Sequence, residues 1–345
     1  MARTLPPALF LIICALAAMA MGCRSDGASP SPTGTSSSPT PQGSVPATAT
    51  PQPVQPTRQV TREPAPSPTA TPSPTATPDT VGADFRQLEA DLVEALESYW
   101  VAGNYAFSVT DLQTGETVGA RGDVPQMSGC VTNFFVILRA VLDVQEGRYG
   151  FDRVDSLIRA TTWSSNAVTA RDLYTIVGDG DTTDGVRRVS ELIEALELEN
   201  TLIDHPPSFH AYSLDIDYNN WSTAEDTNRA LSALWHGEIL DDEHRDYMLE
   251  VMSDVTPGLN YLTAFVPEGV VSHKNGFFYG DTGYVDNDIG IVRLQRGDEE
   301  YAYAVSFYSE EVPTKYGDVV LGQQLGTMAY EVMAARYPAG ASAVR

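Results

Sequence analysis

Apolar residues at helical spacing first appear after about eighty residues that show no such pattern. The first stripe consists of Phe85, Leu88, Leu92, Leu96 and Tyr99, and it predicts an amphipathic helix. Asp84 and Gln87 are spaced like a capping box, so we expect this helix to begin near Asp84.

The pattern then changes from helical spacing to alternation. Tyr105, Phe107 and Val109 alternate with Ser108 and Thr110, which predicts a strand. Thr114 and Gly115 predict a turn, and a return strand is expected from Thr117. Apolar residues at helical spacing dominate residues 130–252, apart from 202–221, which lack clear periodicity. Further strands are expected at 270–274, 289–294 and 301–308, before a last helix at 319–337.

This order of elements predicts a two-lobed α/β (α+β) fold. The strands at the two ends of the folded region are expected to form one antiparallel sheet flanked by the terminal helices. The central helices would form a second, all-helical lobe. A cleft between two such lobes is a common place for a small-molecule site.

The N-terminal residues have the features of export and tethering. Residues 1–23 combine a basic start with a short apolar run, which predicts a signal peptide. The run ends in small residues before Cys23, as in a bacterial lipobox, so Cys23 is the expected lipidation site. The alternative is ordinary cleavage and secretion. Residues 24–81 are rich in Pro, Ser and Thr and predict a disordered linker. The folded domain would occupy residues 82–345, outside the cytoplasm.

Composition restricts the partners and the sources of stability. The net charge of -25 argues against nucleic-acid binding, because such a surface repels phosphate backbones. Of the three cysteines only Cys130 lies in the folded domain, so an internal disulfide is excluded there. The five histidines show no metal-ligand spacing, and no cofactor or metal is expected. We expect the domain to be a monomer.

Three short motifs occur in a fixed order along the folded domain. The first is SGCVTNFF, which contains Cys130 and Asn133 and precedes a strongly apolar helix. The second is Ser164-Ser165-Asn166, and the third is Lys274-Asn275-Gly276 on a predicted strand. Together they resemble the Ser-x-x-Lys, Ser-Asp-Asn and Lys-Thr-Gly motifs of class A serine β-lactamases and penicillin-binding proteins. The resemblance covers essentially everything after the linker.

The resemblance assigns a role to each of these positions. Ser164 would relay a proton, and Asn166 would bind a substrate amide. Lys274 would attract the substrate carboxylate, with Asn275 and Gly276 beside it on the same strand. The backbone N–H groups of Cys130 and Phe277 would form the oxyanion hole.

The first motif departs from the family where the reaction needs it most. Cys130 stands at the position of the nucleophilic serine, and Asn133 at the position of the lysine. A neutral amide cannot accept a proton near neutral pH, so Asn133 cannot act as the base. A cysteine ionises more readily than a serine, and a helix N-terminus favours the thiolate.

The glutamate that activates the deacylating water in class A enzymes has no evident counterpart. No glutamate lies between Glu199 and Glu225. Asp204, Asp215 and Asp217 are the only nearby carboxylates, and the sequence places none of them in the site.

The sequence therefore predicts a β-lactamase-like domain of an exported lipoprotein that binds rather than hydrolyses its ligand. A β-lactam or a peptidoglycan-derived molecule is the expected ligand. Two alternatives stay open. The first is an active β-lactamase-type hydrolase that uses Cys130 as nucleophile, and the second is a non-enzymatic interaction module at the cell envelope.

Overall fold

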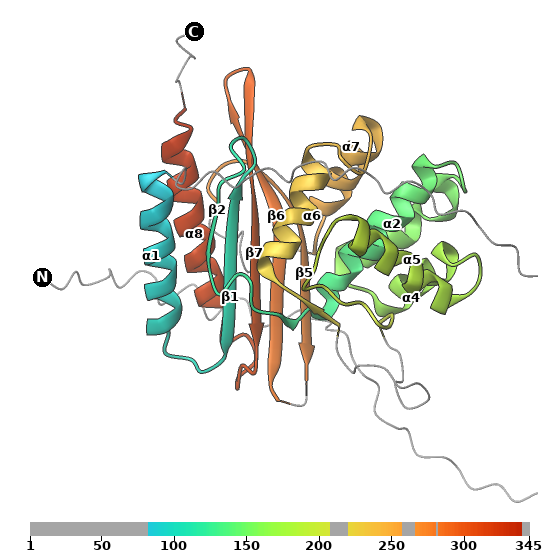
Figure 1. Cartoon of the computed structure of the whole chain (residues 1–345), viewed down its shortest axis with the longest axis horizontal. Coiled ribbons are helices and arrows are strands. Elements are labelled where there is room, and N and C mark those ends of the chain that lie inside the picture. Colours follow the sequence, from blue (N-terminus) through green and yellow to red (C-terminus); the bar gives the residue numbers. More distant parts are fainter. Residues whose placement is uncertain (1–81, 208–219, 257–265, 281, 340–345) are drawn as a thin grey trace, which may run out of the picture. The chain divides into compact units, whose positions relative to one another are not determined.

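The computed structural model describes residues 82–207, 220–256, 266–280 and 282–339. A five-stranded antiparallel sheet in the order β2-β1-β7-β6-β5 forms its centre (Figure 1). The strands are β1 (Asn104–Asp111), β2 (Thr117–Ala120), β5 (Val270–Tyr279), β6 (Tyr284–Arg296) and β7 (Glu299–Glu310). The prediction of one sheet built from both ends of the folded region is thus confirmed.

Two helices from the ends of the domain cover one face of this sheet. They are α1 (Ala83–Ser98) and α8 (Val319–Arg336), which pack side by side (Figure 1). Alternate residues of the strands bury against them, among them Phe107, Val292 and Phe307. Successive side chains of a strand point to opposite faces of the sheet, so the residues between them face the other lobe.

The other face of the sheet packs against the helical lobe, as expected from the sequence. The helices are α2 (Asn133–Gln145), α3 (Asp155–Ser164), α4 (Ala167–Val177), α5 (Thr182–Ala195), α6 (Ala224–Trp235) and α7 (Asp242–Met252). Strand residues such as Ile289, Ile291 and Ala304 share one core with α2 and α6. A second, small sheet of β3 (Gln126–Met127) and β4 (Trp221–Ser222), which the sequence pattern did not predict, joins residues far apart in the chain.

The first helix begins near Asp84 as expected, but the predicted capping box is wrong. Gly82 is the N-cap of α1, and no side chain caps the helix. Asp84 lies inside the first turn and pairs instead with Arg336 of α8 at 2.9 Å. Arg336 also bonds to the buried carboxylate of Asp111 at 2.6 Å. The Asp84 carboxylate therefore links α1 to α8 instead of capping α1.

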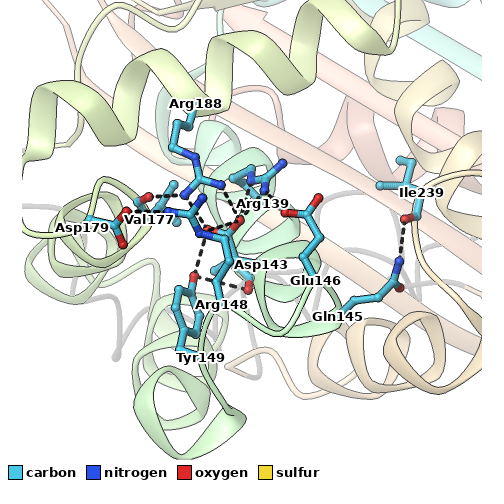
Figure 2. Close-up of polar contacts among 11 residues, drawn as sticks. Arg139, Asp143, Gln145, Glu146, Arg148, Tyr149, Val177, Asp179, Arg188 and Ile239 are labelled. Carbon is cyan, nitrogen blue, oxygen red and sulfur yellow. Dashed lines mark hydrogen bonds and ion pairs between the residues drawn. The ribbon is translucent and has the colours of Figure 1, made fainter.

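The helical lobe is held by a buried polar cluster at the end of α2 (Figure 2). The carboxylate of Asp143, fully buried, contacts the guanidinium groups of Arg139, Arg148 and Arg188. Tyr149 donates a hydrogen bond to the same carboxylate at 3.2 Å. Since Arg188 belongs to α5, this cluster fixes α5 against α2.

Among the described residues no helix has the length and apolar character needed to span a bilayer.

Candidate active site

Cys130 lies where the edge strand β5 passes the N-terminal end of α2. A 3₁₀ turn, Gly129–Thr132, carries the cysteine directly into that helix. The side chain is only 5% exposed. Its thiol donates weakly to the carbonyl oxygen of Phe277 over 3.9 Å. The nucleophile position of the first motif thus meets the strand that carries the third.

Gly276 allows this close approach. A Cβ atom built on Gly276 would lie 2.8 Å from the Val131 nitrogen and 2.9 Å from the Cys130 nitrogen. Backbone atoms cannot move away as a flexible side chain could, so only glycine fits here without displacing the turn. The structure places Cys130 and Phe277 together, while the oxyanion hole formed by their N–H groups stays a prediction.

The side chain of Lys274 on β5 is buried, and its ammonium group contacts oxygen atoms of the protein. That side chain is 1% exposed. The ammonium contacts Ser165 Oγ and the carbonyl oxygen of Asn275, and it lies 3.5 Å from Asn275 Oδ1. Ser165 in turn donates to the Asn275 carbonyl at 3.2 Å. A buried ammonium needs such acceptors because its desolvation is costly. Lys274, Ser165 and Asn275 therefore form one cluster that joins β5 to the helical lobe.

The second motif contacts Lys274 through Ser165, whereas the resemblance assigns the proton relay to Ser164. Ser164, half-buried, donates to Ala160 of its own helix at 3.4 Å. Ser165 adopts the left-handed conformation with φ +53° at the end of α3, which directs its hydroxyl to Lys274. The hydroxyl that contacts Lys274 is therefore that of Ser165, and the proton-relay role of Ser164 stays a prediction. The sequence could not show the contact of Ser165, because the chain reverses direction at that residue.

Asn166 is exposed and caps the next helix. Its side-chain oxygen accepts from Val168 N at 3.0 Å and Thr169 N at 3.2 Å, as an N-cap of α4 does. The amide-binding role implied by the resemblance stays a prediction.

Asn133, at the position of the family's lysine, is fully buried. Neither its amide nitrogen nor its amide oxygen has a hydrogen-bond partner among the residues that the structure describes. An unpaired buried amide costs about 1–3 kcal/mol. The residue that the resemblance puts at the place of the general base is therefore a neutral amide that no described neighbour satisfies.

His273 points away from Lys274, as strand alternation predicts. Its Nδ1 lies 2.8 Å from Asp288 Oδ1 on the neighbouring strand β6. Both side chains are buried. The histidine therefore belongs to a polar pair on the face covered by the terminal helices, and not to the thiol of Cys130.

A buried acid pair that sequence analysis missed lies further along the same face. Asp286 of β6 pairs across the strands with Phe277, and Asp318 directly precedes α8. Both carboxyl groups are fully buried, and Ser309 hydrogen-bonds to Asp318. Burial raises the pKa of Asp318 above its ordinary value, against the opposing effect of hydrogen bonds with Asp286 and Ser309. Only the DND sequence at residues 286–288 of an otherwise apolar strand could have indicated such a cluster.

Two further expectations concern carboxylates and metals. Asp215 and Asp217 lie outside the described residues. The backbone N–H of Asp204 donates to Asn220 Oδ1 at 2.9 Å, which links the residue before β4 to Asp204. Within the described ranges no three His, Cys, Asp or Glu side chains gather as metal ligands would.

Known proteins with the same architecture are β-lactamases and penicillin-binding proteins. A class A β-lactamase from Bacteroides cellulosilyticus DSM 14838 is 19% identical, with a TM-score of 0.62 over 73% of this chain and 99% of that chain. The TLA-3 extended-spectrum β-lactamase is 18% identical, with a TM-score of 0.61 over 72% and 99%. PBP-A is 16% identical, with a TM-score of 0.59 over 72% and 96%.

At this level of identity the similar structures establish the fold. No curated protein matches the chain. The model of the family described as "Beta-lactamase enzyme family" (Beta-lactamase2) matches residues 87–333, which is most of the chain. The chain therefore belongs to the β-lactamase enzyme family.

Proposed function

We propose that this protein is an extracytoplasmic binder of β-lactams or cell-wall peptides that no longer turns them over efficiently. The observation that carries the proposal is the contrast within one site. The close approach of Gly276 to Cys130 is kept, whereas the position of the base holds the unpaired amide of Asn133.

The shape of the site supports ligand binding. The thiol of Cys130 lies against the Phe277 carbonyl on the rigid edge strand β5. Such an arrangement on regular elements positions a ligand better than a loop does. A variant of PBP-A, one of the similar structures, is described as an acyl-enzyme complex with penicillin G. Penicillin G is therefore the first ligand to test.

The chemistry of the site argues against fast turnover. Only the thiolate is nucleophilic, so acylation requires a group that removes the thiol proton. Asn133 cannot remove that proton, and the buried ammonium of Lys274 is turned to Ser165 and Asn275. Neither Asn133 nor Lys274, as they are placed, would therefore activate the thiol for acylation.

The N-terminal sequence supports the location. We propose that Cys23 carries a lipid and that residues 24–81 hold the domain away from the membrane. Polyproline-rich sequence forms a semi-rigid spacer, which suits such a stalk. A ligand derived from peptidoglycan would be available there.

The test is binding and turnover of penicillin G by the mature chain. Titration calorimetry should show saturable binding, and the absorbance of a chromogenic β-lactam should change no faster than in buffer. Gly276→Ala should abolish binding, since its Cβ would meet the backbone at Cys130. Gly297→Ala is the matched control, because its Cβ meets no atom within 4 Å although its φ of +68° also favours glycine.

The alternatives predict different results. Hydrolysis that is lost in Cys130→Ala would establish the active thiol hydrolase. An absence of both binding and hydrolysis would leave the interaction module at the cell envelope.

A further inference from the structure

The chain contains only two lysines. Lys274 belongs to strand β5, and Lys315 lies against Phe277 of the same strand. Lys274 is buried. Lys315 lies in the segment between β7 and α8 and is exposed. Its ammonium nitrogen is 5.3 Å from the centre of the Phe277 ring and 4.8 Å from that of Tyr316. These distances are typical of cation–π contacts.

The rings beneath Lys315 form a continuous cluster. We define this ring cluster as Phe277, Tyr279, Tyr284 and Tyr316. The ring centres of Phe277 and Tyr284, which stack, are 5.9 Å apart, and those of Tyr284 and Tyr279 are 4.7 Å apart. The Tyr279 residue is 68% exposed. Solvent therefore reaches an aromatic surface with a cation beside it.

Two features of this surface point to a ligand. Tyr316 is held at φ +60°, a strained conformation for a residue other than glycine, and such strain concentrates at binding sites. Lys315 forms no ion pair with any residue that the structure describes. In a protein with a net charge of -25, an exposed cation without a carboxylate partner among these residues is a candidate site for an anion from outside.

Lys274 is poorly placed to receive that anion. Its ammonium already contacts Ser165 and Asn275, and moving it to a ligand would leave buried oxygens unsatisfied. The exposed ammonium of Lys315 gives up only a surface cation–π contact, which is weak. Phe277 links the two places, because its carbonyl receives the Cys130 thiol and its ring lies beneath Lys315.

We propose that Lys315 and the ring cluster form a binding subsite for carboxylates that carry an apolar ring. The ammonium binds the carboxylate, and the exposed rings pack against the ring of the ligand. This deepens the proposed function and rests on it for the natural ligand, because Lys315 rather than Lys274 would hold the carboxylate. The subsite itself requires no acylation.

The scarcity of lysine allows a direct test with the full mature chain. Reductive methylation with ¹³C-formaldehyde labels only accessible lysines and the α-amino group. Phenylacetate, acetate and phenylacetamide are the probes, titrated at 0.15 M salt, where screening limits remote charges to about 8 Å. The Lys315 signal, assigned by its loss in Lys315→Met, should shift saturably with phenylacetate. Acetate and phenylacetamide should bind at least tenfold more weakly, because each lacks one half of the ligand.

A second cation–π pair provides the matched control. Arg153, also exposed, lies 5.4 Å above the Tyr149 ring in the helical lobe. Arg153→Met should leave phenylacetate binding unchanged, whereas Lys315→Met and Tyr316→Leu should each weaken it at least tenfold. An unshifted Lys315 signal, or an equal response to acetate and phenylacetate, would overturn the subsite.

Penicillin G separates this inference from the proposed function. If penicillin G fails to bind while phenylacetate binds at Lys315, the proposed function fails and the subsite stands. If penicillin G binds equally to wild type and Lys315→Met, the subsite is wrong as the carboxylate anchor and the proposed function stands.

Discussion

The two ends of helix α2 bury polar side chains in opposite ways. At its C-terminal end the carboxylate of Asp143 is contacted by three guanidinium groups and a tyrosine hydroxyl (Figure 2). At its N-terminal end both amide atoms of Asn133 lack a partner among the described residues. Both residues are fully buried on the same apolar helix. The difference therefore lies in their neighbours and not in the depth of burial.

This contrast distinguishes a buried polar residue that stabilises the fold from one that does not. A buried polar group that serves the fold is normally surrounded by partners, because an unpaired one is costly. Asp143 fits that rule, and Asn133 breaks it at the position where the family has its lysine. We infer that Asn133 lowers the stability of the fold, which is consistent with the proposed change of chemistry at this site.

The largest expected effect follows from removing the charge of Asp143. Asp143→Asn keeps the shape but leaves Arg139, Arg148 and Arg188 around a neutral group. Removing one partner of a buried ion pair lowers the free energy of unfolding by about 3–5 kcal/mol. Urea unfolding measures the loss. The control is Glu146→Gln, which removes an exposed partner of Arg139 and should cost at most about 1 kcal/mol. Equal losses in both variants would contradict the assigned role of Asp143.

A smaller effect of opposite sign is expected at Asn133. Asn133→Leu replaces an unsatisfied amide by an apolar side chain of similar volume in an apolar helix. The free energy of unfolding should rise by about 1–3 kcal/mol, the cost of the unpaired amide.

Asn228 is the matched control, because it is equally buried but satisfied. Its side chain accepts from Ser306 at 2.7 Å and donates to Thr110 at 3.4 Å. Asn228→Leu should therefore destabilise the protein in the same urea experiment. A loss of stability in both variants would show that Asn133 has partners after all.

The smallest effect concerns the pH dependence of stability. The pKa of Asp318 is raised in the folded state by burial, so the folded protein holds this proton at pH values where the unfolded chain has lost it. Stability from this group is therefore greatest near and below the ordinary pKa of 3.8 and falls as pH rises through the folded pKa. Asp318→Asn keeps a polar group beside Ser309 and should flatten that fall. Urea midpoints from pH 4 to pH 8 measure it, and unchanged slopes would contradict the shift.

The architecture follows from the sequence because apolar spacing determines which face of each element is buried. The stripe from Phe85 to Tyr99 predicted α1 within two residues. Asp84 was misassigned because a cap and a long-range ion pair use the same residue type. Its partner Arg336 is 252 residues away.

The candidate site was only partly predictable for a related reason. The motifs brought Cys130, Ser165 and Lys274 to the correct elements, but motif spacing does not report a left-handed turn such as that at Ser165. Lys315 belongs to no motif. Its place over Phe277 depends on how the segment before α8 returns to the sheet, and no local pattern records that contact.

The most direct test of this account is intact-protein mass spectrometry of the mature chain with penicillin G, beside the Cys130→Ser/Asn133→Lys variant. If the altered nucleophile and base alone stop the reaction, the wild type should gain no mass. The variant, with both family residues restored, should gain one penicillin. A penicillin adduct on the wild type that disappears in Cys130→Ala would contradict the account, because Cys130 would then be a working nucleophile.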